Sequence, residues 1–252
     1  MDQEISETVA KPKRQTFKQK VESAVIACMD RRLNEKLRSR ADGRTIFLRN
    51  AGANVSGLAK SIKKAVKTYP NLRSLTVMVH TDCGGMKTVF AAMQGKDFGK
   101  DVTKSLVKPF KVATKHNIIQ FSTREELERV NSDFQKRALE EIIAKAAPGS
   151  SIVVNVESVE LQPAEHPVVE PVVVLALPSV TDMNKISGMV GRDINGFYVL
   201  NAFNFKEVLP DMAIAKTLEL HSIKMIGKSE KPFANITGKI PEGMSAEFSK
   251  LA

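Results

Sequence analysis

A histidine and a cysteine stand three residues apart in the sequence HTDCGGMK, at positions 80–87, where an apolar run ends. The chain has one other cysteine, Cys28, which ends an earlier apolar run in the sequence CMDRR. Two cysteines cannot build a disulfide framework, and in a reducing compartment such a pair more often serves a metal or catalysis. Two thiolates and an imidazole suit tetrahedral zinc, so Cys28, His80 and Cys83 are candidate ligands of Zn²⁺.

The number of ligands decides which kind of zinc site this could be. A structural site needs four protein ligands, and the chain has no third cysteine to complete it. His116, His166 and His221 are the other histidines, but His116 has no ligand spacing to the cluster, and we favour water or Asp30 in the fourth position. Three protein ligands with an exchangeable fourth are typical of catalytic zinc. The competing interpretation is two buried free cysteines and a hydrogen-bonded core histidine.

The elements that must position these residues are short strands that alternate with helices. Four runs rich in β-branched residues predict buried strands at residues 24–29, 45–49, 74–80 and 151–157. Helical patterns lie between them, one from Val55 to Tyr69 and a long one from about Arg124 to Ala147, which Ser122 and Glu125 open as a capping box. This alternation predicts an α/β fold with a mainly parallel sheet flanked by helices. Because ligands gather at the carboxyl ends of such strands, the three candidate ligands can converge there.

Composition and charge limit the other classes of function. The net charge of +10 would suit an anionic partner, but the lysines of the helix at 55–69 lie mostly off its apolar stripe and form a solvated face. Residues 11–20 are the best candidate basic patch, and they contain no recognisable binding motif. No apolar run approaches the ~18 residues that span a bilayer, and the first residues lack the apolar region of a secretory signal. We therefore expect a cytoplasmic protein that binds neither nucleic acid nor membrane.

Three motifs together resemble the β-class carbonic anhydrases. They are CMDRR at 28–32, RNAGA at 49–53 and HTDCGGMK at 80–87, and the resemblance covers about residues 20–162. It implies that Cys28, His80 and Cys83 are the zinc ligands. It also implies that Asp30 and Arg32 form a carboxylate–guanidinium dyad beside the metal.

The resemblance implies an activity as well, the reversible hydration of CO2 to bicarbonate and a proton by a zinc-bound hydroxide. Asp30 would accept the hydroxide proton and orient the nucleophile, while Arg32 holds the carboxylate in a forked pair. In some family members this aspartate instead ligates the zinc, and the sequence does not decide between the two forms. Asn50, Gly52 and Gly84 are predicted pocket residues, with glycines where the backbone comes close to the site. The alternatives are hydrolysis of COS or CS2 at the same zinc site, and a catalytically silent structural or interaction protein.

The remainder of the chain predicts a second, degenerate copy of the same unit. The proline-rich stretch around residues 163–171 is typical of a linker. Beyond it, segments 172–186, 195–205 and 222–230 align on 23–37, 44–54 and 75–83. In this alignment Leu177 replaces Cys28, Ile226 replaces His80 and Ser229 replaces Cys83, so every metal ligand is lost.

We therefore predict two domains, a zinc-binding domain at 1–163 and a linker with a metal-free repeat at 164–252. Members of the family resemble one another in pairing two copies with the active site at their junction. The resemblance then implies a fused pseudo-dimer with one zinc site per chain, and self-association into oligomers of such pseudo-dimers.

Overall fold

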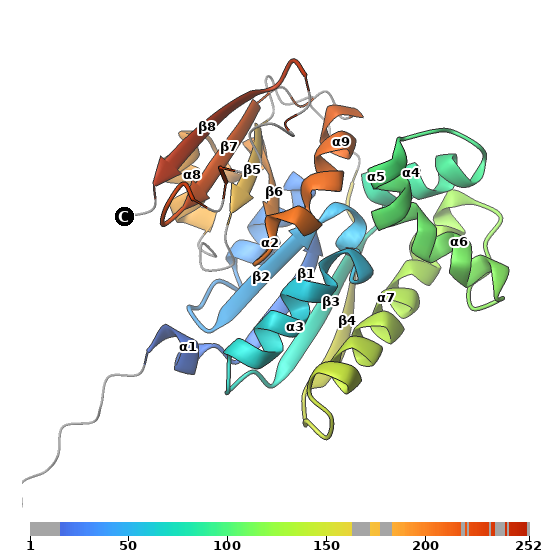
Figure 1. Cartoon of the computed structure of the whole chain (residues 1–252), viewed down its shortest axis with the longest axis horizontal. Coiled ribbons are helices and arrows are strands. Elements are labelled where there is room, and N and C mark those ends of the chain that lie inside the picture. Colours follow the sequence, from blue (N-terminus) through green and yellow to red (C-terminus); the bar gives the residue numbers. More distant parts are fainter. Residues whose placement is uncertain are drawn as a thin grey trace, which may run out of the picture.

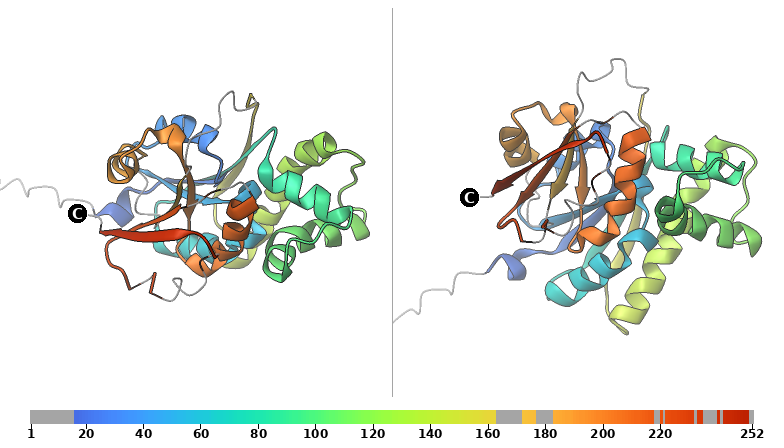
Figure 2. Two further views of the ribbon diagram at one scale, coloured as in Figure 1. Left: turned by 90° about the horizontal axis from the view of Figure 1, so that it is seen from above. Right: turned by 45° about the horizontal axis from the view of Figure 1, so that its top comes forward.

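A single eight-stranded sheet dominates the computed structural model, which describes residues 16–162, 172–176, 183–217, 222–231 and 242–250 together with Leu220, Phe233, Ala234 and Ile240. The strand order is β4-β3-β1-β2-β6-β5-β7-β8 (Figure 1). Helices cover both faces, with α2 and α8 on one side and α3, α7 and α9 on the other (Figure 2). The predicted α/β fold, a mainly parallel sheet flanked by helices, is confirmed.

Four parallel strands form the half of the sheet that carries the motifs. They are β1 (Ser23–Cys28), β2 (Thr45–Asn50), β3 (Ser74–His80) and β4 (Val153–Val159). All residues of β2 and all but the first of β1 are buried, which explains their near-continuous apolar sequences. In the ladder between β1 and β2, Cys28 lies opposite Asn50.

The other half of the sheet has four parallel strands of its own. They are β5 (Val172–Ala176), β6 (Phe197–Asn201), β7 (Ser222–Gly227) and β8 (Ser245–Lys250). The halves join through an antiparallel pair in which Arg49 of β2 lies opposite Asn201 of β6. Counted outward from this junction, both halves have the same order, with β2-β1-β3-β4 on one side and β6-β5-β7-β8 on the other.

The strand ladders refine the alignment of the two halves. Ala176 of β5 lies opposite Asn201, just as Cys28 of β1 lies opposite Asn50. The structure therefore matches Ala176 to Cys28, whereas the sequence alignment matches the next residue, Leu177, to Cys28. Leu177 itself lies outside the described residues, as does the proposed linker at 163–171.

The helices of the first half run between its strands and after them. They are α1 (Phe17–Lys20), η1 (Arg31–Leu33), α2 (Asn34–Arg38), η2 (Ala51–Ala53), η3 (Ser56–Leu58), α3 (Ala59–Thr68), α4 (Gly84–Met93), α5 (Lys100–Val102), the π-helical η4 (Thr103–Val107), α6 (Lys108–Lys115) and α7 (Arg124–Ala146). The predicted cap of α7 is wrong by one residue. Thr123 is the N-cap, and its hydroxyl accepts the backbone N–H of Glu126. The Glu126 carboxylate in turn accepts the backbone N–H groups of Ser122 and Thr123.

The second half has shorter helices. They are α8 (Met183–Val190), η5 (Ile194–Gly196), η6 (Phe205–Glu207) and α9 (Leu209–Thr217). Across the described ranges, every helix is too short or too polar to cross a membrane.

Candidate metal centre

Cys28, His80 and Cys83 converge at the carboxyl ends of two neighbouring strands. Cys28 ends β1, His80 ends β3, and Cys83 immediately precedes α4. All three are buried, and their ligand atoms lie within 4.8 Å of one another. The two sulfur atoms are 3.9 Å apart. The cluster thus has the donor set and the compactness of a zinc site with three protein ligands.

The histidine of the cluster leaves one nitrogen without a partner. Its Nδ1 lies 2.8 Å from the carbonyl oxygen of Thr81, which can only accept a hydrogen bond, so Nδ1 carries a proton. Nε2 is buried and has no hydrogen-bond partner among the described residues. A buried polar atom without a partner is costly, and here it faces two sulfur atoms. The residues therefore fit a bound metal ion.

The environment of Cys28 favours its thiolate form, which is the form that binds metal. The Cys83 thiol and the His80 ring lower the pKa of Cys28 well below its usual value, although burial acts in the opposite direction. The backbone N–H of Gly52 also points to the Cys28 sulfur at 3.3 Å. The pKa of Cys83 is raised, because the Cys28 sulfur and burial both disfavour a second negative charge there.

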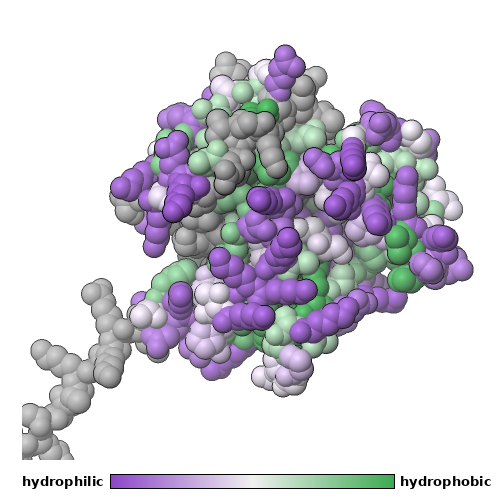
Figure 3. Space-filling model, viewed as in Figure 1, coloured by the Kyte–Doolittle hydropathy of each residue, from purple (hydrophilic) through white to green (hydrophobic). Residues whose placement is uncertain are grey.

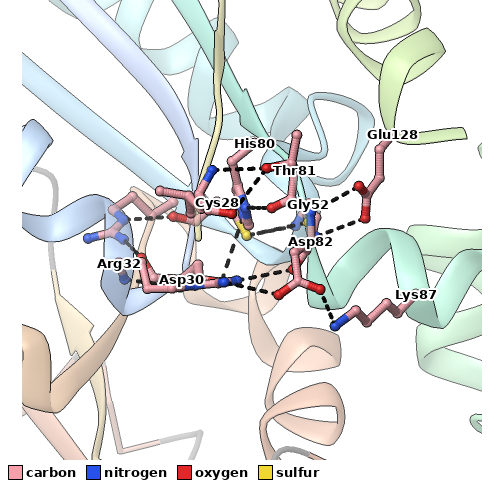
Figure 4. A network of polar contacts seen from close by, with 12 residues as sticks. Cys28, Asp30, Arg32, Gly52, His80, Thr81, Asp82, Lys87 and Glu128 are labelled. Carbon is pink, nitrogen blue, oxygen red and sulfur yellow. Dashed lines mark hydrogen bonds and ion pairs between the residues drawn. The ribbon is translucent and has the colours of Figure 1, made fainter. Parts of the chain in front are cut away.

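Asp30 and Arg32 form the forked pair expected beside the cluster (Figure 4). Arg32 donates from Nη2 to Asp30 Oδ2 at 2.8 Å and from Nε to Oδ1 at 3.1 Å. Burial opposes ionisation of Asp30, but the bonds from Arg32 hold the pKa of this carboxyl below its usual range. Asp30 Oδ2 lies 4.0 Å from His80 Nε2, and Asp30 pairs with Arg32 rather than joining the three-residue cluster.

Three further charged residues extend this network, and the sequence analysis missed all of them. Asp82 accepts a bond from Arg32 Nη1 at 3.0 Å and pairs with Lys87 Nζ at 2.5 Å. Glu128 of α7 accepts the backbone N–H groups of Asp82 and Cys83, at 2.9 and 3.0 Å. The position of Asp82 inside the quoted HTDCGGMK motif is the one signal that could have indicated it. Glu128 has no such signal, because it is 45 residues from Cys83.

A buried arginine supports the other side of the cluster. The side chain of Arg49 is fully buried and donates to the carbonyl oxygens of Cys28 and Asp30, at 3.0 and 2.9 Å. It also donates to Asn34 Oδ1 at 2.6 Å. Burial lowers the pKa of Arg49 to about 10, so the group remains a cation at neutral pH. Arg49 therefore fixes the backbone between Cys28 and Asp30.

Two glycines are required where the loop after β2 passes the start of α4. Gly52 has a φ of 72°, in the region that favours glycine, and a Cβ there would lie 2.7 Å from Met86 Cε. A Cβ at Gly85 would lie 2.7 Å from the backbone nitrogen of Gly52. This close approach of two backbones places the Gly52 N–H against Cys28.

The cluster opens into a small cavity lined by residues of both halves. Its volume is about 20 Å³, room for about one water molecule. The first half contributes Cys28, Met29, Asp30, Ala51, Gly84 and Gly85, and the second half contributes Tyr198 of β6 and Ile214 of α9. The cavity therefore lies at the junction of the two halves.

The remaining predicted residues differ in their relation to this cavity. Gly84 lines the cavity. Gly52 does not line it, and its backbone N–H donates to the Cys28 sulfur. Asn50 is buried and donates to the carbonyl oxygen of Asn54 at 2.9 Å, so its amide braces the loop. His116 is exposed at the end of α6, away from the cluster, while His166 and His221 lie outside the described residues.

Known sequences match this part of the chain. A sequence profile of the family described as carbonic anhydrase matches residues 23–160, which include the metal cluster and the Asp30–Arg32 pair. The chain belongs to the carbonic anhydrase family. The three motifs typical of its β class lie inside the match, so the predicted family is confirmed. No curated protein matches the chain.

Solved structures of carbonic anhydrases resemble part of the fold. A tetrameric β-carbonic anhydrase from Sordaria macrospora has 17% identity and a TM-score of 0.44, covering 56% of this chain and 77% of that chain. The β-carbonic anhydrase of Aspergillus fumigatus has 23% identity and a TM-score of 0.45, covering 56% and 72%. An apo form of carbon disulfide hydrolase has 17% identity and a TM-score of 0.33, covering 56% and 75%. These likenesses extend over little more than half of this chain.

Proposed function

We propose that the protein is a zinc enzyme that catalyses the reversible hydration of CO2 to bicarbonate and a proton. Cys28, His80 and Cys83 are the proposed ligands of one zinc ion. The observation that carries the proposal is the unpartnered Nε2 of His80, buried beside two cysteine sulfurs and 4.0 Å from a paired carboxylate. Bound zinc would supply a Lewis acid that makes water nucleophilic at neutral pH.

Asp30 is the proposed orienting group. Its carboxylate is held ionised by Arg32 and lines the cavity, so it can accept a hydrogen bond from the attacking water and direct the oxygen lone pair at the substrate carbon. Arg32 in turn is held by Asp82, whose own pKa stays below its usual range because Lys87 and Arg32 outweigh the effect of burial. The dyad therefore stays ionised and fixed as pH falls toward the acidic range.

We also propose that residues 164–252 contain a degenerate, metal-free copy of the first unit, fused to it as a pseudo-dimer. The matching strand orders and the cavity walls from Tyr198 and Ile214 support this. So do the bonds across the junction. Asn34 donates to the carbonyl oxygen of Phe197 at 2.8 Å, and the Glu207 carboxylate accepts the backbone N–H groups of Lys60 and Ser61 at the start of α3. Self-association of such pseudo-dimers and a cytoplasmic location stay predictions from the sequence.

The test combines metal analysis with substrate turnover. We expect purified chain to contain close to one zinc per chain and to hydrate CO2 in a stopped-flow pH-indicator assay. Turnover of COS or CS2 without CO2 hydration would replace the proposed substrate. Zinc content near zero after preparation without chelator would favour a catalytically silent structural protein.

A further inference from the structure

A hollow with an apolar floor lies away from the Cys28–His80–Cys83 cluster, between α6 and α7. Its volume is about 370 Å³, in the range of small-ligand sites. Its floor is formed by Pro109, Val112, Ala113, Ile118, Phe134 and Ala138. It shares no lining residue with the cavity beside Cys28. The proposed reaction therefore does not explain it.

We call this space the α6–α7 hollow. Contacts between the segments that surround it hold its walls in place. The rings of Phe110 and Phe134 lie 4.8 Å apart and tie α6 to α7. Asn54 donates to the carbonyl oxygen of Ser105, and the Val55 N–H donates to Gln135 Oε1, both at 2.8 Å. A site that is held open before binding loses less entropy when a ligand enters.

Three cations stand around the apolar floor. Lys104, Lys108 and Arg137 line the hollow, all are exposed, and none lies within 4.0 Å of a described carboxylate. Glu141 also lines it, but its carboxylate pairs with Lys145 at 3.9 Å. Figure 3 shows strongly hydrophobic atoms among hydrophilic ones over the region of α6 and α7. Three cations and one carboxylate, that of Glu141, thus line the hollow, which leaves its rim with a net positive charge.

The local helix geometry gathers these lysines on one side. Lys104 and Lys108 are four residues apart, a spacing that places two side chains on the same face of a helix. The segment from Thr103 to Val107 is π-helical, and both side chains also line a neighbouring hollow with Lys100 and Lys111. Such π turns are frequent at functional sites.

We propose that the α6–α7 hollow binds an organic anion that has an acid group at one end and an apolar body, such as a medium-chain carboxylate. The acid group would pair with Lys104, Lys108 and Arg137, and the apolar body would cover the floor. Val112 and Ile118 are 44% and 48% exposed, and covering them removes apolar surface from water. A nucleic acid would use the lysines but would leave these two aliphatic side chains uncovered, so we favour the amphiphilic anion.

Calorimetric titration of the full-length, zinc-loaded protein with decanoate, below its micelle concentration, tests the proposal. We expect one decanoate per chain, and at least tenfold weaker binding of decanol, which has the same chain without the charge. The double variant Lys104→Glu with Arg137→Glu should weaken decanoate binding at least tenfold. Ile118→Asp, which places a carboxylate on the floor without touching the cations, should weaken it as well.

The matched control is Lys63→Glu with Lys67→Glu on α3, which makes the same change in net charge on an exposed face. It should bind decanoate within twofold of the unchanged protein, and circular dichroism should show all variants folded. An equal loss in the control would overturn the proposal, since general charge would then explain binding. Equal affinity for decanol, or binding to vesicles of anionic lipid but not to monomeric decanoate, would overturn it too.

Discussion

The two halves of the sheet share a strand order but differ in the residues at the carboxyl ends of their strands. β1 and β3 end in Cys28 and His80, whereas β5 and β7 end in Ala176 and Gly227, which offer no side chain to a metal. Every residue of β5 is nevertheless buried, as in β2. The comparison teaches that apolar strand packing, rather than the Cys28–His80–Cys83 cluster, holds this arrangement of strands.

The halves also differ in how they are covered. In the first half the 23-residue helix α7 packs on β3 and β4, the outer strands of that side. In the second half no helix is present among the described residues between β7 and β8, and β8 is mostly exposed. The second half therefore relies more on the first for burial, and the first relies on the second for two walls of the cavity.

Removal of the second half should have the largest effect. Deleting residues 164–252 would uncover the β2 edge and the apolar surface at the junction, and would remove Tyr198 and Ile214 from the cavity. We expect the 1–163 fragment to aggregate or to dimerise through the exposed face, with low activity even where zinc is bound. Size-exclusion chromatography and CO2 hydration measure this. A monomeric, fully active fragment would falsify the pseudo-dimer.

Loss of one metal ligand should be nearly as severe for the site while sparing the fold. Cys83→Ser should reduce zinc from about one per chain to near zero and abolish CO2 hydration, because two ligands do not retain the ion. Ser229→Ala, at the position that the sequence alignment pairs with Cys83, is the matched control and should keep both. Mass spectrometry of the metal content decides, and zinc retained in Cys83→Ser would make the ligand assignment wrong.

Changes in the dyad should affect activity without removing zinc. Asp30→Asn should lower CO2 hydration about 10²-fold or more, the usual scale for a lost acid–base group. Arg32→Ala removes the contacts that depress the pKa of Asp30, so that pKa should rise. The acid limb of the pH–rate profile should then move to higher pH, and Asp30 would be freed to approach the metal. Unchanged profiles in both variants would show that the dyad has no role.

The smallest effect is expected from the hydrogen bonds that join Glu207 of the second half to the start of α3 in the first half. Glu207→Ala removes the acceptor of the Lys60 and Ser61 N–H groups and should cost about 1–3 kcal/mol, or roughly 2–4 °C in Tm per kcal/mol. Glu35→Ala, at an exposed carboxylate, is the control.

Thermal melts measured across a range of pH give a second test of Glu207. Burial raises the pKa of Glu207 above its usual value, although its hydrogen bonds oppose this.

A raised carboxyl pKa means that the folded state binds the proton more tightly than the unfolded chain does. The contribution of Glu207 to stability is then fully present below the usual glutamate pKa and is lost as pH rises through the raised value. The Glu207→Ala variant should lack this part of the pH dependence. A melt profile that keeps the same slope from pH 4 to 7 in the variant would contradict the shift.

Much of the fold and the central cluster could be predicted from local patterns. The four strands of the first half lie within two residues of their predicted positions, because β-branched runs bounded by polar turns are a local signal. The one-residue error at Thr123 has a local cause, since Ser122 and Thr123 both suit an N-cap and only the backbone decides between them. The strand β8 was not predicted, because its sequence SAEFSK is too polar for a buried run.

The sequence by itself predicted the three residues of the cluster, since only two cysteines exist and each comes after an apolar run, within a motif of the family. It also predicted that the first strands are mainly parallel, through the alternation of strand and helix patterns. Only the tertiary structure decided that Glu128 holds the Cys83 loop, that Arg49 is buried under the dyad, and that Tyr198 closes the cavity. Tyr198 lies 170 residues beyond Cys28 in the chain. Contacts of this kind depend on how whole layers pack, and no local pattern of residue types encodes that packing.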